Sequence, residues 1–288
     1  MSSFRIRRPD PSLYEVPLLL YDSPHSGRRY PADFETSLEK VVLRRAEDAY
    51  VDELLAGTPK YGAVVLDAIC PRCIIDVNRA ESDIDVTLLR EPWPGEVAPT
   101  DKSARGLGLV RRYVTPGVEI NSRPLEISEL RDRIDNSYRP YHSALDELVE
   151  EIWDARGFVW HINWHSMKAT GNAMTPDGVG AKRPDFVVSN RDWQSASPEL
   201  TEWIVGALKS FGYSVSLNDP YKGGSIVERI GSPSDKIHSI QIEINRALYL
   251  DEERVETHKG FADLARNIET FTAGLGALAS TSGTLKHF

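Results

Sequence analysis

The sequence predicts an α/β fold in which helices cover both faces of a largely parallel central sheet. Short apolar runs of strand length alternate along the chain with longer segments whose apolar residues have helical spacing. The chain has 288 residues, of which 41% are hydrophobic, and this is enough to bury a sizeable core. Several apolar runs end in polar residues, as expected where a ligand binds beyond the carboxyl ends of parallel strands.

These patterns place the individual elements. They predict seven strands, over residues 16–21, 63–68, 73–77, 158–167, 185–189, 213–217 and 237–244. Helical spacing predicts helices over residues 36–57, 128–155, 198–211 and 251 to about 273. We expect a single domain over residues 1–278 and a flexible tail over residues 279–288.

Charge and the first residues of the chain narrow the classes of partner. The net charge is −9, with lysine and arginine scattered, which argues against a nucleic acid or an anionic membrane as partner. No run of about 18 apolar residues is present, and the first residues contain charges and prolines where a signal peptide needs an apolar core. We therefore expect a cytoplasmic protein with a small-molecule substrate, and the oligomeric state stays open.

The only two cysteines, Cys70 and Cys73, form a C-x-x-C pair. Such a pair can be a redox motif or half of a zinc knuckle, but no further ligands follow at knuckle spacing. The pair runs into an apolar stretch that resembles a strand, whereas redox chemistry favours a thiol at a helix N-terminus. We expect two buried or edge thiols in a reducing compartment.

The stretch 158–167 is the most informative part of the chain. Its alternation places His161, Asn163 and His165 on one face of a strand and the two tryptophans on the other. Burying two imidazoles and an amide is costly without partners, and a hydrogen-bonded structural pair is the common explanation. A functional role is favoured because His25 also follows an apolar run, and because 237–244 delivers polar side chains at its end.

Two further groups of polar residues are candidates. Glu47, Asp48 and Asp52 lie on the helix expected over 36–57, either as a solvated acidic stripe or as carboxylates that complete a metal site with the histidines. Asn78 and Arg79 follow a predicted strand, and a guanidinium there can clamp a carboxylate with two parallel hydrogen bonds. The alternative is an ion pair of this arginine with a nearby carboxylate, Glu81, Asp83 or Asp85.

Five short motifs together resemble the N-formylglutamate amidohydrolase family over roughly residues 15–275. In chain order they are Pro-His-Ser-Gly at 24–27, Glu-Asp-Ala-Tyr-Val-Asp-Glu-Leu at 47–54, Asp-Val-Asn-Arg at 76–79, His-Ser-Met at 165–167 and Gln-Ile-Glu-Ile-Asn at 241–245. The family is related to the zinc carboxypeptidases and aspartoacylases. The resemblance therefore implies a zinc-carboxypeptidase-like fold with three layers (α/β/α) around a mixed, largely parallel sheet, and one zinc ion.

The resemblance also implies roles for particular residues. His25 and His165 would be metal ligands and Glu243 the catalytic carboxylate, while Asn78 and Arg79 would hold a substrate carboxylate. The chain departs from the relatives' His-x-x-Glu zinc motif, because Arg28 stands where the acid would be. We expect Asp48 to be the acidic ligand, with Glu47 as the next candidate and Asp52 as a supporting residue. The family often has aspartate at the position of Asn163, and His161 has no assigned role.

The implied reaction is zinc-dependent hydrolysis of the linear amide bond of an N-acyl amino acid. The leading substrate is N-formyl-L-glutamate, which gives formate and glutamate in histidine degradation. The alternative substrates are another N-acyl amino acid or a cell-wall peptide. The alternative function is a non-catalytic protein that binds a carboxylate. A dicarboxylic substrate needs a second cation, for which the candidates are Arg111, Arg112, Arg123, Arg133 and Lys222.

Overall fold

The computed structural model describes residues 2–282, and a seven-stranded sheet forms its centre. The strand order across the sheet is β1-β3-β2-β4-β7-β5-β6. The strands are β1 (Phe4–Arg7), β2 (Leu19–Ser23), β3 (Ala63–Ala68), β4 (Val159–Met167), β5 (Phe186–Ser189), β6 (Val215–Leu217) and β7 (Ile237–Asn245). A separate hairpin pairs β8 (Leu250–Asp251) with β9 (Glu256–Thr257).

The four central strands β3, β2, β4 and β7 run parallel to one another, and the outer strands β1 and β5 pair antiparallel with them. The expected mixed, largely parallel sheet is therefore confirmed. In the β4–β7 pair, His165 lies directly opposite Glu243. Because the central strands are parallel, their carboxyl ends meet at one edge of the sheet.

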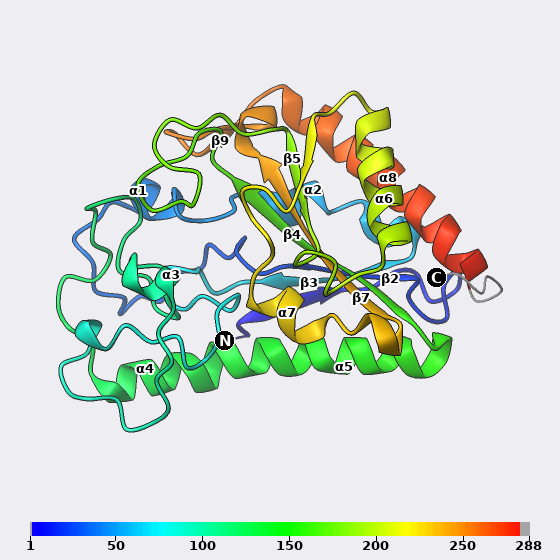
Figure 1. Cartoon of the computed structure of the whole chain (residues 1–288). Coiled ribbons are helices and arrows are strands. Elements are labelled where there is room, and N and C mark those ends of the chain that lie inside the picture. Colours follow the sequence, from blue (N-terminus) through cyan, green and yellow to red (C-terminus); the bar gives the residue numbers. More distant parts are fainter. Residues whose placement is uncertain (1, 283–288) are drawn as a thin grey trace.

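Helices cover both faces of the sheet, which confirms the three layers (Figure 1). On one face lie α4 (Ile127–Arg133), α5 (Arg139–Arg156) and α7 (Ser225–Ile230), with a π-helical turn at Ile134–Tyr138 joining the first two. On the other lie α2 (Val51–Leu54), α6 (Pro198–Ser210) and α8 (Gly260–Ser282). The connections contain two short helices, α1 (Lys40–Arg44) and α3 (Asp101–Ala104). They also contain four 3₁₀ turns, at Thr58–Tyr61, Val86–Leu88, Pro233–Asp235 and Arg246–Leu248.

The alternation predicted for the central strand is present in β4. Trp160, Ile162 and Trp164 pack into the core under α6 and α8, where the Trp164 ring meets Phe271 edge-on at 5.9 Å between ring centroids. Val159 packs into the opposite core, beneath α5. One strand thus supplies apolar side chains to one layer and carries polar ones on its other face.

Three predictions of secondary structure are wrong. The helix expected over 36–57 consists only of α1 and α2, because Tyr50 has a left-handed backbone (φ 65°) that cannot continue a helix. Residues 73–77 form turns rather than a strand, with the Asp76 carboxylate accepting from the Asn78 N–H. Residues 251–257 form the β8–β9 hairpin, so the last helix begins at Gly260.

Two further differences concern the ends of the chain. Strand β1 was not predicted, and it is held at the sheet edge by ion pairs from Arg5 and Arg7 to Asp67. Helix α8 continues to Ser282, which covers the first four residues of the expected tail; the rest, 283–288, lies outside the described residues. None of the helices described is long and apolar enough to cross a bilayer.

Candidate active site

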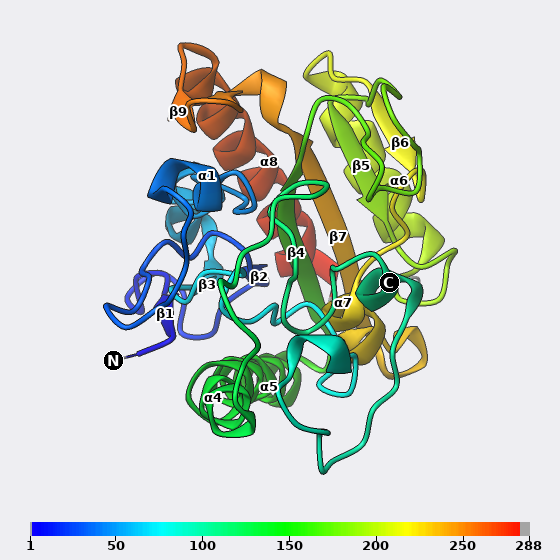
Figure 2. The same ribbon diagram turned by 90° about the vertical axis from the view of Figure 1, so that its left-hand side faces the viewer.

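The candidate site is a cavity of about 430 Å³ at the carboxyl ends of the central strands. Figure 2 looks at this edge of the sheet, with the long connection that contains α3 lying in front of it. His25 follows β2 by two residues, His165 lies near the end of β4, and Glu243 lies near the end of β7. All three line the cavity. The expectation that these strand ends meet at one site is met.

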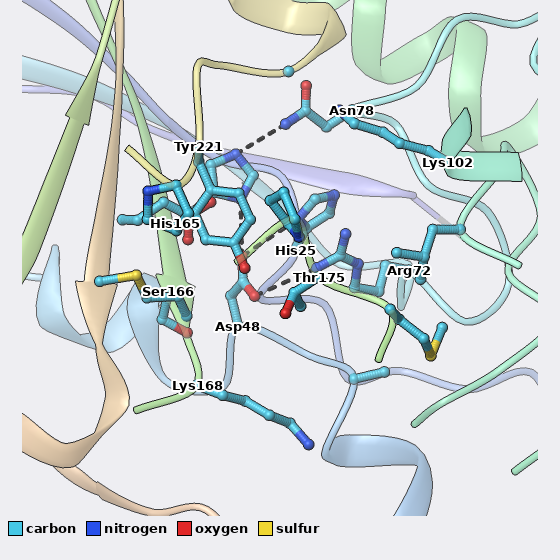
Figure 3. A pocket seen from close by; sticks show the side chains of 18 of the residues that line it. His25, Asp48, Arg72, Asn78, Lys102, His165, Ser166, Lys168, Thr175 and Tyr221 are labelled. Carbon is cyan, nitrogen blue, oxygen red and sulfur yellow. Dashed lines mark hydrogen bonds and ion pairs between the residues drawn. The ribbon is translucent and has the colours of Figure 1, made fainter. Parts of the chain in front are cut away.

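His25, Asp48 and His165 form a compact buried cluster, and their side chains point toward one another in Figure 3. The Oδ2 atom of Asp48 lies 3.3 Å from Nδ1 of His25 and 2.9 Å from Nδ1 of His165. All three ligand atoms fall within 4.8 Å of one another. Two imidazole nitrogens and one carboxylate oxygen are a donor set that suits zinc and leaves a coordination position open.

Asp48 is held at the cluster by contacts that come from distant parts of the chain. Its N–H donates to the carbonyl of His25 at 3.0 Å, and Arg246 donates to its second carboxylate oxygen at 3.1 Å. Burial would raise the pKa of the Asp48 carboxyl, but hydrogen bonds from His165 and His25 hold this pKa well below its ordinary value. The carboxylate is therefore ionised, as a metal ligand must be.

The other two acidic candidates lie outside the cluster. Glu47 accepts hydrogen bonds from Tyr30 at 2.9 Å and Arg44 at 3.1 Å. Asp52, the second residue of α2, lies 3.5 Å from Arg5 and 3.7 Å from Arg28. The structure thus brings Asp48, and neither neighbour, to the histidines.

The outer nitrogens of the two imidazoles are also bonded. Nε2 of His25 donates to Oδ1 of Asp76 at 2.6 Å, and that carboxylate also receives a hydrogen bond from Arg72 at 2.8 Å. Burial opposes the ionisation of Asp76, but the charges of Arg72 and His25 hold its pKa well below its ordinary value. On the other side, Nε2 of His165 lies 2.7 Å from Oδ1 of Asn163. Such outer hydrogen bonds orient metal-binding histidines and support the fit of the cluster to a metal ion.

Asn163 is in turn anchored by a buried network beneath the site. Its amide donates to Asp22 at 2.7 Å, and the same carboxylate binds Tyr141 at 2.8 Å and His161 at 3.0 Å. His161 also bonds Ser239 at 2.8 Å, so both of its ring nitrogens have partners. His161 is therefore a buried structural histidine. The carboxylate of this network belongs to Asp22 on β2, and it is linked to His165 by the side-chain amide of Asn163.

Glu243 lines the same cavity and is 9% exposed. Gln241 donates to its carboxylate at 3.0 Å and itself accepts from the N–H of Gly224 at 2.8 Å, which fixes both side chains. Burial raises the pKa of Glu243, and the positive field of His165 only partly offsets this. A carboxylate in a cavity whose pKa is raised is a candidate for general acid–base chemistry.

Asn78 and Arg79 both line the cavity, in different ways. The Asn78 amide accepts from the N–H of Ile226 at 2.9 Å and lies 3.1 Å from Nε2 of His165. A Cβ atom at Gly224 would overlap this amide, so glycine is required there. Arg79 donates to the carbonyls of Leu107 and Asn78, both at 2.7 Å.

Arg79 forms no ion pair with any carboxylate among the described residues. Glu81 pairs instead with Arg139, and Asp85 pairs with Arg112. Asp83 accepts from Thr100. The three carboxylates that could have neutralised Arg79 are therefore engaged elsewhere, and its guanidinium stays available in the cavity.

The cavity carries further positive charge around the cluster. Lys102 and Lys168 lie on opposite sides of the cluster in Figure 3. The charge of Arg79, together with burial, lowers the pKa of Lys102 to about 8. Burial and the charge of Arg246 lower the pKa of Lys168. A cavity with this field attracts anionic ligands.

Sequence reasoning missed Arg72, Asp76 and Arg246 as functional residues. Asp76 belongs to the Asp-Val-Asn-Arg motif, and its place there was the one available signal. Arg72 stands between the two cysteines of the C-x-x-C pair, a motif that indicates thiol chemistry and not the binding of a carboxylate. Arg246 follows the Gln-Ile-Glu-Ile-Asn motif directly, but its partner Asp48 is remote in sequence.

The two cysteines are free thiols, as expected. Cys73 is buried, and burial raises its pKa to about 11. A thiol with so high a pKa is a poor nucleophile and a poor metal ligand at neutral pH. The cavity is lined by neither cysteine.

Comparisons with known proteins agree with this geometry. A family model described as N-formylglutamate amidohydrolase matches residues 17–250. An N-formylglutamate deformylase of Pseudomonas putida is 28% identical over 250 residues, which cover 86% of each chain. The N-formylglutamate deformylase of Pseudomonas aeruginosa is 27% identical over 256 residues, which cover 87% of each chain.

Solved structures are similar over nearly the whole chain. The crystal structure of an N-formylglutamate amidohydrolase from Ralstonia eutropha JMP134 has a TM-score of 0.90 and 37% sequence identity, and covers 98% of this chain and 100% of that one. A gene product of Agrobacterium tumefaciens has a TM-score of 0.69 at 16% identity, with 97% of both chains covered. The second similarity is one of fold.

Proposed function

The chain belongs to the N-formylglutamate amidohydrolase family and is an amidohydrolase, and we propose that it hydrolyses N-formyl-L-glutamate to formate and L-glutamate. One observation carries the proposal. A single cavity holds the His25–Asp48–His165 cluster, the carboxylate of Glu243 and the unpaired guanidinium of Arg79. These are the parts that hydrolysis of an N-acyl amino acid needs: a metal site, a proton carrier and a carboxylate binder.

We propose that His25 and His165, through their Nδ1 atoms, and Asp48 hold a zinc ion. Asp76 and Asn163 orient the two imidazoles from behind, and Arg246 keeps the carboxylate of Asp48 in place. When bound, zinc supplies Lewis-acid chemistry, since it acidifies water and polarises an amide carbonyl.

Glu243 is proposed as the proton carrier. Its carboxylate removes the proton from the attacking water and delivers it to the departing amide nitrogen. The raised pKa of Glu243 suits both steps, because the group must accept a proton and then release it. The hydrogen bond from Gln241 holds the carboxylate in one orientation toward the cavity.

Arg79, positioned beside Asn78, is proposed to bind the α-carboxylate of the substrate. Its Nε and one terminal nitrogen are anchored on backbone carbonyls, which fixes the plane of the guanidinium. An anchored guanidinium places a carboxylate with a defined orientation. The amide to be cleaved is then held at a defined position beside the His25–Asp48–His165 cluster.

Formate release from N-formyl-L-glutamate by the purified protein tests the proposal. We expect release that a chelator abolishes and added zinc restores. Activity that persists after all metal is removed would contradict the zinc site. If the protein hydrolyses other N-acyl amino acids or cell-wall peptides but releases no formate from N-formyl-L-glutamate, its substrate is a different one. The place in histidine degradation and the cytoplasmic location stay predictions.

A further inference from the structure

Among the described residues, two buried arginines that line the cavity form no ion pair with a carboxylate. Arg79 is 9% exposed and Arg111 is 8% exposed, and both line the cavity. The other buried or well-anchored cations there are neutralised: Arg72 by Asp76, Arg183 by Asp177 and Arg246 by Asp48. Within residues 2–282, Arg111 makes one side-chain hydrogen bond, a long one of 3.4 Å from Nε to the carbonyl of Tyr113. Its terminal nitrogens therefore have unused donors.

A buried guanidinium without a partner is energetically unfavourable, and proteins seldom keep one without a reason. Burial and the nearby charge of Arg72 both disfavour the charged form of Arg111 and lower its pKa to about 9. The group is still protonated at neutral pH. An anionic ligand group beside Arg111 would remove the penalty, because it supplies the missing charge and the missing acceptors.

The structure also separates Arg111 from the other candidates for a second cation. Arg112 is paired with Asp85, and Arg123 with Glu35 and Glu129. Arg133 donates to the carbonyl of Ile74 and does not line the cavity. Lys222 lines the cavity, but it is exposed and paired with Asp192. Of the five residues that sequence could not rank, one is buried, unpaired and in the cavity.

We propose that Arg111 binds the side-chain carboxylate of the substrate, so that the site selects N-formyl derivatives of dicarboxylic amino acids. The inference rests on the proposed function, in which Arg79 holds the α-carboxylate. The two unpaired guanidiniums of the cavity then bind the two carboxylates of the substrate. A neutral side chain of the same size would leave Arg111 unpaired in the complex and would be rejected for that reason.

The test compares N-formyl-L-glutamate with N-formyl-L-glutamine, which has the same shape and no side-chain charge. We expect the wild-type protein to prefer the glutamate derivative by about 100-fold in kcat/KM, the size of a lost charged hydrogen-bond pair. In Arg111→Met this preference should fall below about tenfold, through loss of activity on the glutamate derivative alone. Equal losses on both substrates, or an unchanged preference, would overturn the proposal.

Two control variants sharpen the comparison. Arg112→Met removes the neighbouring arginine, which does not line the cavity, and should keep the wild-type preference. Arg79→Met should lower kcat/KM for both substrates by similar factors, because both carry the α-carboxylate. If Arg79→Met instead removes the preference and Arg111→Met does not, the assignment of Arg111 is wrong.

A binding measurement separates failure of this inference from failure of the proposed function. Calorimetric titration with glutarate and with glutaramate, its mono-amide, reports on two-carboxylate recognition without turnover. Wild-type protein should bind glutarate more tightly by at least about tenfold, and Arg111→Met should lose this difference. If formate release is absent but the wild-type protein prefers glutarate and Arg111→Met does not, the proposed reaction is wrong and the inference about Arg111 stands. If Arg111→Met does not fold, Arg111→Lys replaces it, with a reduced preference expected and an unchanged one contradicting the proposal.

Discussion

His25 and Asp76 are joined by a hydrogen bond of 2.6 Å, from Nε2 of the imidazole to Oδ1 of the carboxylate. The opposite nitrogen of the same ring faces Asp48, so the imidazole is fixed between two carboxylates. The hydrogen bond on the outer side determines which nitrogen is free to bind a metal and raises the basicity of that nitrogen. Asp76 is therefore expected to affect the proposed metal site through His25.

Asp76→Asn should weaken zinc binding by about 10- to 100-fold, because the amide supports the imidazole less strongly than the carboxylate does. Competition with a chromophoric chelator measures the zinc Kd directly. Asp85→Asn, which alters a carboxylate paired with Arg112 outside the cavity, is the matched control and should leave the Kd unchanged. A folded Asp76→Asn variant with the wild-type Kd would contradict the role given to this residue.

Asn163→Asp should destabilise the protein, although the family resemblance leads one to expect aspartate at this position. The new carboxylate would face Asp22, which now accepts from the Asn163 amide at 2.7 Å in a fully buried network. Two buried carboxylates in contact should lower the free energy of unfolding by about 3 kcal/mol. Urea denaturation measures the change.

The companion variant Asp22→Asn completes a double-mutant cycle with Asn163→Asp. The pair exchanges carboxylate and amide, so the double variant should recover at least about 1 kcal/mol relative to the sum of the single changes. Additive losses would show that the two side chains do not interact as the structure indicates.

Glu243→Gln should lower kcat by about a thousandfold or more while the zinc content stays the same, because the amide cannot carry a proton. Gln241 would still orient the side chain, so the geometry of the cavity is retained. Formate release and metal analysis are measured on the same preparation. Full turnover in a zinc-loaded variant would exclude Glu243 as the proton carrier.

His142 should make stability depend on pH. Its Nε2–H donates to the carbonyl of Val77 at 2.9 Å and its Nδ1 accepts from Arg229 at 3.1 Å, an arrangement that needs the neutral ring. Burial and the charge of Arg229 lower the pKa of His142 from 6.5 to about 4. The unfolded chain therefore takes up a proton below pH 6.5, whereas the folded protein does so only near pH 4.

Stability should consequently fall as the pH drops from about 6.5 to 4, by up to about 3 kcal/mol from this residue. Urea denaturation at several pH values, for the wild type and for His142→Gln, isolates the contribution. The difference between the two proteins should shrink toward low pH. Parallel profiles would show that His142 has the same pKa in the folded and the unfolded protein.

The parts of the fold that sequence predicted are those with a strong local pattern. The alternation in 158–167 and 237–244 and the helical spacing in 128–155 and 198–211 correspond to β4, β7, α4 with α5, and α6. The helix expected over 36–57 failed because tertiary contacts decide this segment. Arg246 binds the carbonyls of Arg45 and Glu47, and such partners 200 residues away leave no trace in a local pattern.

The same distinction applies to the site. His25, Asp48 and His165 could be named because short motifs carry them, and the structure brings them together. Arg111 could not be separated from four other cations, because what distinguishes it is the absence of a partner in the described structure. That property depends on burial and on the direction of every nearby carboxylate. Neither can be predicted from the residues next to Arg111 in the sequence.

The parallel pairing of β4 and β7 has a consequence for how this site can change over evolution. Sliding one strand by a single residue would turn its side chains to the other face, and sliding it by two would move them by roughly 6.6 Å. A change of register can therefore alter the separation between His165 and Glu243 only in large steps. Arg79 and Arg111 lie outside the helices and strands and are free of this restraint. A change in these loops can therefore move the two guanidiniums without altering the spacing of His165 and Glu243.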